Sequence, residues 1–126
     1  MPNPEIEEFA KILVREVRDC AIRSCDVPLR PNAAGPMGKR WKEAAARDPE
    51  VFAKVIIPDV VDVTVFELLR TIDEGLLKLS FTASKGEKVD LTVDGLSELA
   101  GWYAGIPGWR SMYSKERFID DYSDLR

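Results

Sequence analysis

Carboxylates near the middle of the chain are the residues most suited to chemistry. Five of them recur within residues 59–74: Asp59, Asp62, Glu67, Asp73 and Glu74. At about 100° per residue they project from roughly the same third of a helix, together with Arg70. They could act as general acid and base or bind a hard cation, whereas on a solvated helix they form a polar stripe around Arg70. Nothing in the spacing imposes a cleft, so we expect the exposed stripe.

Histidine is absent from the chain, which removes the commonest general base and the Ser-His and Cys-His nucleophile pairs. Cys20 and Cys25 fall in one expected helix, about 140° apart around its axis, so we expect two reduced, partly buried thiols and no disulfide. Two cysteines without histidine cannot supply the common zinc ligand sets, and the glycines form no phosphate-binding motif. The sequence predicts no metal and no cofactor, and it favours binding over catalysis.

A small basic and aromatic group suggests a second kind of chemistry. Lys39, Arg40 and Trp41 are adjacent, and Arg30 lies shortly before them. Such a group could hold an anion or stack on a nucleic-acid base. The net charge of −4 makes nucleic acid an unfavourable partner, because phosphate binding depends on clustered Lys and Arg. These four residues are secondary binding candidates, and a solvated helix face is the plainer interpretation.

Aromatic residues concentrate near the C-terminus. Trp109 follows the sequence of residues 106–108, Ile-Pro-Gly, a turn that normally lies at a protein surface, and it precedes Arg110. Trp, Arg and Tyr are the residue types most enriched in binding hot spots. We therefore predict an exposed partner-binding patch of Trp109, Arg110 and Tyr113. In the alternative, Trp109 folds back onto the core and these aromatics are structural.

The first half of the chain predicts a long helix and a long loop. Residues 4–25 have the apolar spacing of an amphipathic helix, with Asn3 as its cap and Pro4 as its first residue. Residues 26–38 are rich in proline and glycine, so they are expected to be a loop. A loop of this length is often functional, which makes it a further place for contact with a partner or ligand. The plainer interpretation is a segment that wraps the core and is pinned over it by its prolines.

The middle of the chain predicts more helices. One is expected over residues 39–47, and another from Pro49 until Pro58 stops it. A third is expected over residues 60–74, where apolar residues gather on one broad face. Residues 60–66 are rich in β-branched side chains, so a strand is the alternative there.

The clearest pattern is a β-hairpin. Apolar and polar residues alternate over residues 77–83 and again over residues 88–93, so each strand is expected to bury one face. A loop of residues 84–86, with Gly86 in the left-handed conformation, sets the register. The predicted cross-strand pairs are Phe81 with Val89, Leu79 with Leu91, and Leu77 with Val93. Both edges stay unpaired, so a homodimer through a hairpin edge is available.

Two short helices are expected after the hairpin. Asp94 is placed to cap the first, which Gly105 ends. Ser114 is placed to cap the second, which contains Phe118 and Tyr122.

Length and composition define the expected fold. The 126 residues are 45% hydrophobic and 32% charged, as in ordinary globular proteins. We predict a single α+β domain over residues 1–126, with roughly four to six helices packed around one antiparallel hairpin. No apolar run approaches a membrane span and the first ten residues do not resemble a secretory signal. A cytoplasmic location without membrane contact is therefore expected.

The predicted function is that of a non-catalytic protein-interaction module, of the inhibitor, immunity or adaptor type. It would use exposed aromatics and an acidic surface against a protein partner, and the charge balance favours a basic one. The alternative is a small-ligand-binding protein or a carboxylate-based enzyme, with a pocket between the hairpin, residues 26–38 and the C-terminal aromatic segment. A flat, exposed Trp109 would favour the first function, and a concave pocket with converging polar groups the second.

Overall fold

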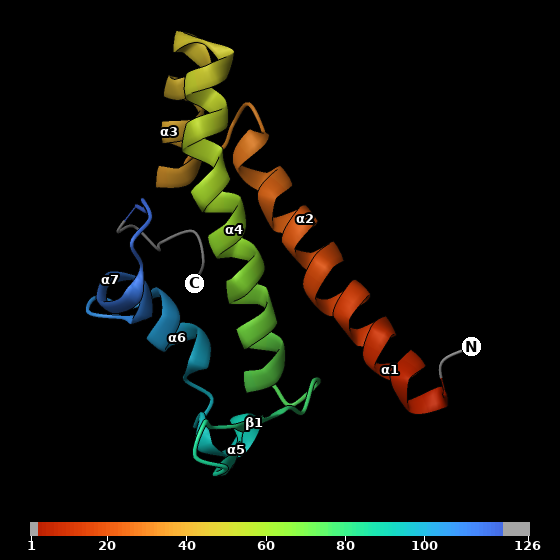
Figure 1. The fold of residues 1–126 in the computed structure, drawn as a ribbon. Coiled ribbons are helices and arrows are strands. Elements are labelled where there is room, and N and C mark those ends of the chain that lie inside the picture. The colour runs from red at the N-terminus through yellow and green to blue at the C-terminus, as the bar shows by residue number, and fades with distance from the viewer. Residues whose placement is uncertain (1–2, 120–126) are drawn as a thin grey trace.

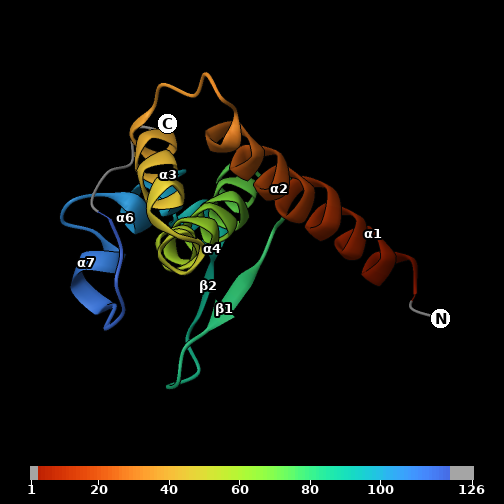
Figure 2. The same cartoon turned by 90° about the horizontal axis from the view of Figure 1, so that it is seen from above.

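The protein is mostly helical and is organised around one long helix. The computed structural model describes residues 3–119. Figure 1 shows α4 (Pro49–Asp73) in the middle, between the N-terminal helix and the C-terminal helices, with α3 (Pro36–Arg47) behind it. Figure 2 shows that the hairpin projects on the side of α4 away from α3. Residues 3–119 contain one antiparallel two-stranded sheet among these helices, so the predicted single-domain α+β class is confirmed.

The N-terminal helix follows its local signals. It is one continuous rod of three segments: α1 (Pro4–Ile12), the π-helical segment η1 (Leu13–Arg18) and α2 (Asp19–Asp26). Asn3 caps the rod by accepting the N–H of Ile6 at 2.9 Å. Val17, in the π-helical segment, and Ala21, in α2, are both buried. The predicted helix over residues 4–25 is confirmed.

The long loop predicted over residues 26–38 is wrong at both ends. The chain forms a 3-10 turn, η2 (Val27–Leu29), and α3 already begins at Pro36. Pro28 and Pro36 each occupy the first turn of their element, where a missing N–H removes no hydrogen bond. Only residues 30–35 of this segment lie outside the helical elements.

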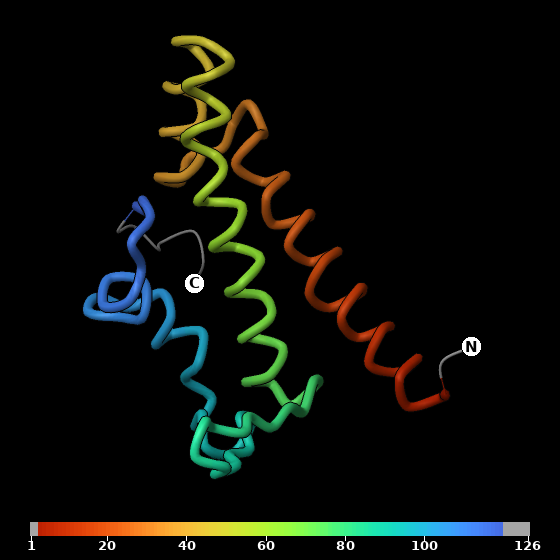
Figure 3. The backbone as a smooth tube through the Cα atoms, viewed as in Figure 1, coloured from red at the N-terminus to blue at the C-terminus, as the bar shows by residue number. Residues whose placement is uncertain are grey.

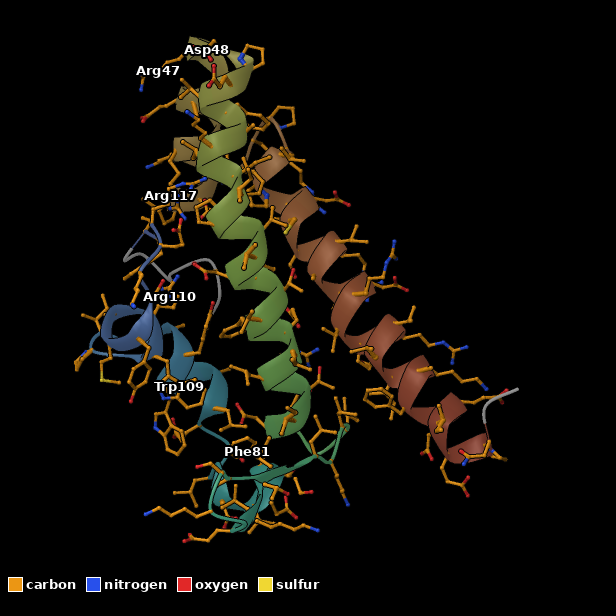
Figure 4. The ribbon with its side chains drawn as sticks, viewed as in Figure 1. Arg47, Asp48, Phe81, Trp109, Arg110 and Arg117 are labelled. Carbon is orange, nitrogen blue, oxygen red and sulfur yellow. The ribbon has the colours of Figure 1, made fainter. Side chains whose placement is uncertain are left out.

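Helix α4 continues through Pro58, so the prediction that Pro58 stops a helix is wrong. Proline removes the hydrogen bond to the carbonyl four residues earlier, which is that of Lys54. The Lys54 carbonyl accepts instead from Nε and Nη2 of Arg117, at 3.3 and 3.1 Å. Figure 3 shows the backbone continuing as one helix, and Figure 4 labels Arg117 alongside its upper half. A side chain from the C-terminal segment thus replaces the donor that Pro58 lacks.

The rest of α4 is also helical, so the helical interpretation of residues 60–66 is confirmed and the strand alternative is not. Asp48 caps the helix by accepting the N–H of Val51 at 2.9 Å. Beyond the last turn, Gly75 takes a φ of +76°, in the left-handed region that glycine enters without steric cost.

The hairpin consists of β1 (Ser80–Thr82) and β2 (Lys88–Asp90), with Phe81 opposite Val89 as predicted. Gly86 has the expected left-handed conformation, with a φ of +92°. The prediction that each strand buries one face is wrong, because Phe81 is 56% exposed. The hairpin projects from the helical body (Figure 2), and all residues of both strands are exposed.

The predicted pairing of Leu77 with Val93 is also wrong. The side chain of Asp90 accepts N–H groups of the next residues and starts a helical turn, α5 (Leu91–Asp94). Val93 belongs to that turn and is solvent-exposed, whereas Leu77 is buried among the helices.

The C-terminal part contains two short helices: α6 (Leu99–Ala104) and α7 (Trp109–Tyr113). Gly105 follows the end of α6 as predicted, but Asp94 does not cap this helix. Ser114 ends α7 by donating its N–H to the Arg110 carbonyl at 3.0 Å, so the helix predicted to start there is wrong as far as residue 119. Tyr122 of that prediction lies outside the described residues.

The contact between Arg117 and Lys54 gives a test of how α4 tolerates Pro58. Arg117→Ala should lower the free energy of unfolding by about 1 kcal/mol, because it leaves the Lys54 carbonyl without its donor. In a Pro58→Ala background the amide of residue 58 can donate to that carbonyl, so the same substitution should cost close to nothing. Urea unfolding of the four proteins measures this coupling. Equal losses in both backgrounds would show that Arg117 acts elsewhere.

Candidate functional site

Most of the predicted acidic stripe of α4 lies inside the molecule. Asp59 is only 3% exposed. Its carboxylate accepts hydrogen bonds from the Arg40 guanidinium at 3.0 and 2.9 Å and from Trp41 Nε1 at 2.7 Å. Both donors belong to α3, so this contact holds α3 against α4. The prediction of an exposed stripe is wrong at Asp59, which is buried. Its burial is possible because α3 supplies the hydrogen-bond donors that a buried carboxylate requires.

Asp62 makes a similar contact with the C-terminal helices. Its Oδ1 accepts the Tyr103 hydroxyl at 2.6 Å, and its Oδ2 forms a buried ion pair with Nη1 of Arg110. The guanidinium of Arg110 also lies over the rings of Tyr103 and Phe118, 5.7 and 5.0 Å from their centroids. Asp62 thereby joins α6 and α7 to α4.

Two further carboxylates of α4 also bind donors on other elements. Asp73 accepts the N–H groups of the first two residues of α6, each at 3.0 Å, and so caps that helix from the end of α4. Glu67 accepts from Arg70 at 2.6 Å and from Ser24 of α2 at 3.4 Å. Only Glu74 of the predicted stripe is an exposed residue. The set is therefore a structural scaffold, because its oxygens already bind protein donors.

The described residues offer little equipment for catalysis. Within residues 3–119, no group of three or more acidic or cysteine side chains is placed to hold a metal ion. Cys20 and Cys25 are both free thiols. Burial raises the pKa of the Cys25 thiol, and the charges of Asp26, Asp59 and Glu67 raise it further. Cys25 is thus kept protonated at neutral pH, which makes it a poor nucleophile.

The predicted patch of Trp109, Arg110 and Tyr113 is divided by the structure. Tyr113 is 74% exposed, but Arg110 is buried in its ion pair with Asp62, so exposure was wrongly predicted there. Trp109 is half-buried and its ring centroid lies 6.2 Å from that of Trp102. Figure 4 labels Trp109 and Arg110 beside α4.

The four secondary binding candidates are divided between the interior and the surface. Trp41 is 2% exposed and Arg40 is half-buried on Asp59, so both belong to the interior. Arg30 and Lys39 are exposed. A continuous basic and aromatic surface is therefore not formed, because Trp41 belongs to the row of α3 that packs on α4.

Within residues 3–119, nothing covers one apolar side of α4. The helix exposes Ile57, Val60, Val61 and Thr64, whose i, i+3, i+4, i+7 spacing places them on one helix face. Ile57 and Val61 are 52% and 54% exposed. The Thr64 hydroxyl donates to the Val60 carbonyl at 2.8 Å, so the face carries no charge and no free polar hydrogen. We call these four residues the open face.

Two clefts flank the open face. One, of about 380 Å³, lies between α4 and the N-terminal helix, and its lining includes Leu13, Ile22 and Val60. The other, of about 450 Å³, lies between α4 and α7, and its lining includes Leu69 and Tyr113. The open face therefore forms a ridge between two largely apolar depressions.

A more enclosed cavity lies elsewhere. Its volume is about 220 Å³, and it is lined in part by residues within 33–38, by Phe66 and by Glu67. The predicted pocket joined residues 26–38 to the hairpin and the aromatic segment, but the remaining walls of this cavity come from α2, η2 and α4. Its carboxylate is already paired with Arg70.

Comparison with protein-family models, curated proteins and solved structures finds no match to this chain. The candidate site therefore rests on the geometry of the chain itself. The open face was not predicted, although a signal for it exists: apolar residues occur around the whole circumference of α4. A helix of that kind needs neighbours on every side.

Tyr103 gives a test of the buried contact at Asp62. Burial raises its pKa, the hydrogen bond to Asp62 and that residue's charge raise it further, and Arg110 has a smaller opposite effect. In the unfolded chain the pKa of tyrosine is about 10. Above that pH the unfolded chain loses a proton that the folded protein keeps, so the stabilisation present at lower pH is lost as pH rises.

We therefore expect wild-type stability to fall more steeply above about pH 10 than that of Tyr103→Phe. Tyr113→Phe, at an exposed tyrosine, is the matched control and should follow the wild type. Urea unfolding at a series of pH values measures the three curves. Parallel curves for wild type and Tyr103→Phe would contradict the protonation linkage.

Proposed function

We propose that this protein is a non-catalytic protein-interaction module that binds an amphipathic helix of a protein partner across the open face of α4. The supporting observation is the exposed, uncharged apolar ridge between two clefts. Contiguous exposed apolar surface is typical of interaction sites. Trp109 and Tyr113 border one of the clefts and add residue types that binding hot spots favour.

The geometry favours a helix as the bound segment. The side of a helix presents no backbone donors or acceptors, because those groups bond within the helix itself. A partner segment must therefore bring a backbone whose hydrogen bonds are already made, which an extended peptide does not. The open face extends about 10 Å along α4, and its ridge can pack between the side-chain rows of a second helix. Apolar partner residues at i, i+3 or i+4, and i+7 would match it.

Charge and thiol chemistry suggest the nature and place of the partner. The net charge of −4 favours basic residues at the margins of the partner helix, because complementary charge speeds association. Two free thiols suit a reducing compartment, so we place the module in the cytoplasm.

Small-ligand binding is the second candidate, supported by the enclosed cavity beside Glu67. Its volume of about 220 Å³ is below the roughly 300–1,000 Å³ of common ligand pockets. Carboxylate catalysis has less support, because Asp59 and Asp62 are each paired with an arginine. A general acid or base needs an oxygen within reach of its substrate.

A library of displayed helical and extended peptides, selected against the wild-type protein, tests the proposed function. We expect enriched sequences with apolar residues at helical spacing. Val61→Glu should weaken the selected peptides at least about tenfold, because it places a charge on the ridge. Val93→Glu is the matched control, since it makes the same change at a valine that is 66% exposed on α5. Both variants should keep the free energy of unfolding within about 0.5 kcal/mol of wild type.

Three outcomes contradict the proposal: enrichment of extended peptides without helical periodicity, equal binding by the two variants, or no enrichment from a diverse library. In the first two cases the recognition surface lies elsewhere on the molecule.

A further inference from the structure

Among the described residues, no element covers the sheet surface of the hairpin. Figure 2 shows the hairpin projecting from the helices, and Figure 4 labels Phe81 on it. Every residue of β1 and β2 is exposed. Phe81 and Val89 lie opposite each other and are 56% and 39% exposed. Two isolated strands are marginally stable in water, so this sheet is short of a neighbour.

Two hydrogen bonds outside the strands define the ladder. The N–H of Leu91 donates to the Leu79 carbonyl at 2.9 Å, and that of Ala83 to the Glu87 carbonyl at 2.7 Å. The predicted pairing of Leu79 with Leu91 is thereby confirmed. In an antiparallel ladder, hydrogen-bonded pairs alternate with pairs that are not bonded. The pair at Phe81 lies two residues from each of these pairs, so it is a bonded pair as well.

The alternation shows which backbone groups point outward. Those of Phe81 point into the hairpin, whereas those of its neighbours Ser80 and Thr82 point away from β2. By the same rule, Lys88 and Asp90 present the outward groups of β2.

The two edges differ in how they are protected. On β2, the outward N–H of Asp90 donates to the Asp94 carboxylate at 2.9 Å. Lys88 and Asp90 also place charges along that edge, which disfavours further pairing. On β1, the outward groups of Ser80 and Thr82 have no partner among residues 3–119. Their side chains are uncharged, and the strand contains no proline.

We infer that a second copy of this chain pairs with the β1 edge, antiparallel, about a two-fold axis beside Phe81. Ser80 of each copy then lies opposite Thr82 of the other, and their outward groups form about four hydrogen bonds. The two Phe81 side chains become direct cross-strand neighbours. The combined sheet has the order β2–β1–β1–β2, and side chains of Phe81 and Val89 form an unbroken apolar row on one face.

A second copy fits this edge because the edge is complementary to itself. In this register Lys78 of one copy faces Ser84 of the other, and Lys85 faces Leu77, so no two lysines oppose each other. The hydroxyls of Ser80 and Thr82 are matched in the same way. A contact between two three-residue strands buries less surface area than the roughly 1,200 Å² of stable protein interfaces. The dimer is therefore weak and forms at high protein concentration.

Cysteine cross-linking tests which edge pairs. In a Cys20→Ser, Cys25→Ser background, Phe81→Cys should form a disulfide dimer under mild oxidation. The two residues 81 form a non-bonded pair about 4.5 Å apart between Cα atoms, within the disulfide range. Val89→Cys, on the other strand of the same face, should stay monomeric, because three strand spacings, roughly 14 Å, separate the two residues 89.

Proline substitution tests the same inference with Phe81 intact. Thr82→Pro removes an outward donor from β1 and should weaken dimerisation at least tenfold in sedimentation over a range of concentrations. Lys88→Pro makes the same change at the residue opposite and should leave the dimer unchanged, because it affects only the β2 edge.

Cross-linking of Val89→Cys instead of Phe81→Cys, or equal cross-linking of both, would overturn the inference. So would a monomeric wild type at every concentration, or equal effects of the two prolines. The protein is tested alone in these experiments, so their outcome is independent of helix binding at the open face.

Discussion

The structure depends on the carboxylates of α4 finding donors on other elements. A buried carboxylate without partners is strongly destabilising, so each one constrains where its donor can lie. Asp59 holds α3 through Arg40 and Trp41, and Asp62 holds α6 and α7 through Tyr103 and Arg110. The acidic residues that suggested catalysis therefore position the helices. Their oxygens are occupied by the protein itself, which is why the acid–base or cation-binding chemistry considered for them has little support.

Because these carboxylates are paired inside the molecule, the exposed surface of α4 that can bind a partner is apolar. α4 carries apolar residues around its whole circumference, but the surrounding helices leave one side uncovered (Figure 1). The open face is therefore a consequence of how the helices are held. The β1 edge differs from it physically, since it offers backbone donors and acceptors while the open face offers only side chains. The two surfaces therefore suit different kinds of bound segment.

Features with causes close in sequence were predictable. Asn3 caps the first helix through a residue three positions away, and Gly86 sets the hairpin register within its own loop. Other features depend on distant partners. Pro58 is tolerated through a bond that spans 63 residues of chain, and Asp62 is buried by a tyrosine 41 residues away. No local pattern encodes such contacts, so the helix end at Pro58 and the exposed acidic stripe were wrongly predicted. The open face was missed for the same reason, because its exposure depends on where the other helices stop.

Methyl-group NMR of the free protein with a soluble paramagnetic gadolinium chelate tests most directly whether the helices around α4 leave the open face uncovered. The chelate accelerates relaxation only of groups that solvent reaches. We expect strong acceleration for the methyl groups of Ile57, Val60 and Val61, and little for Val63 and Ile72, which are 1% and 2% exposed. Protection of Ile57 and Val61 equal to that of Val63 would contradict this, because it would mean that something covers the face in the free protein.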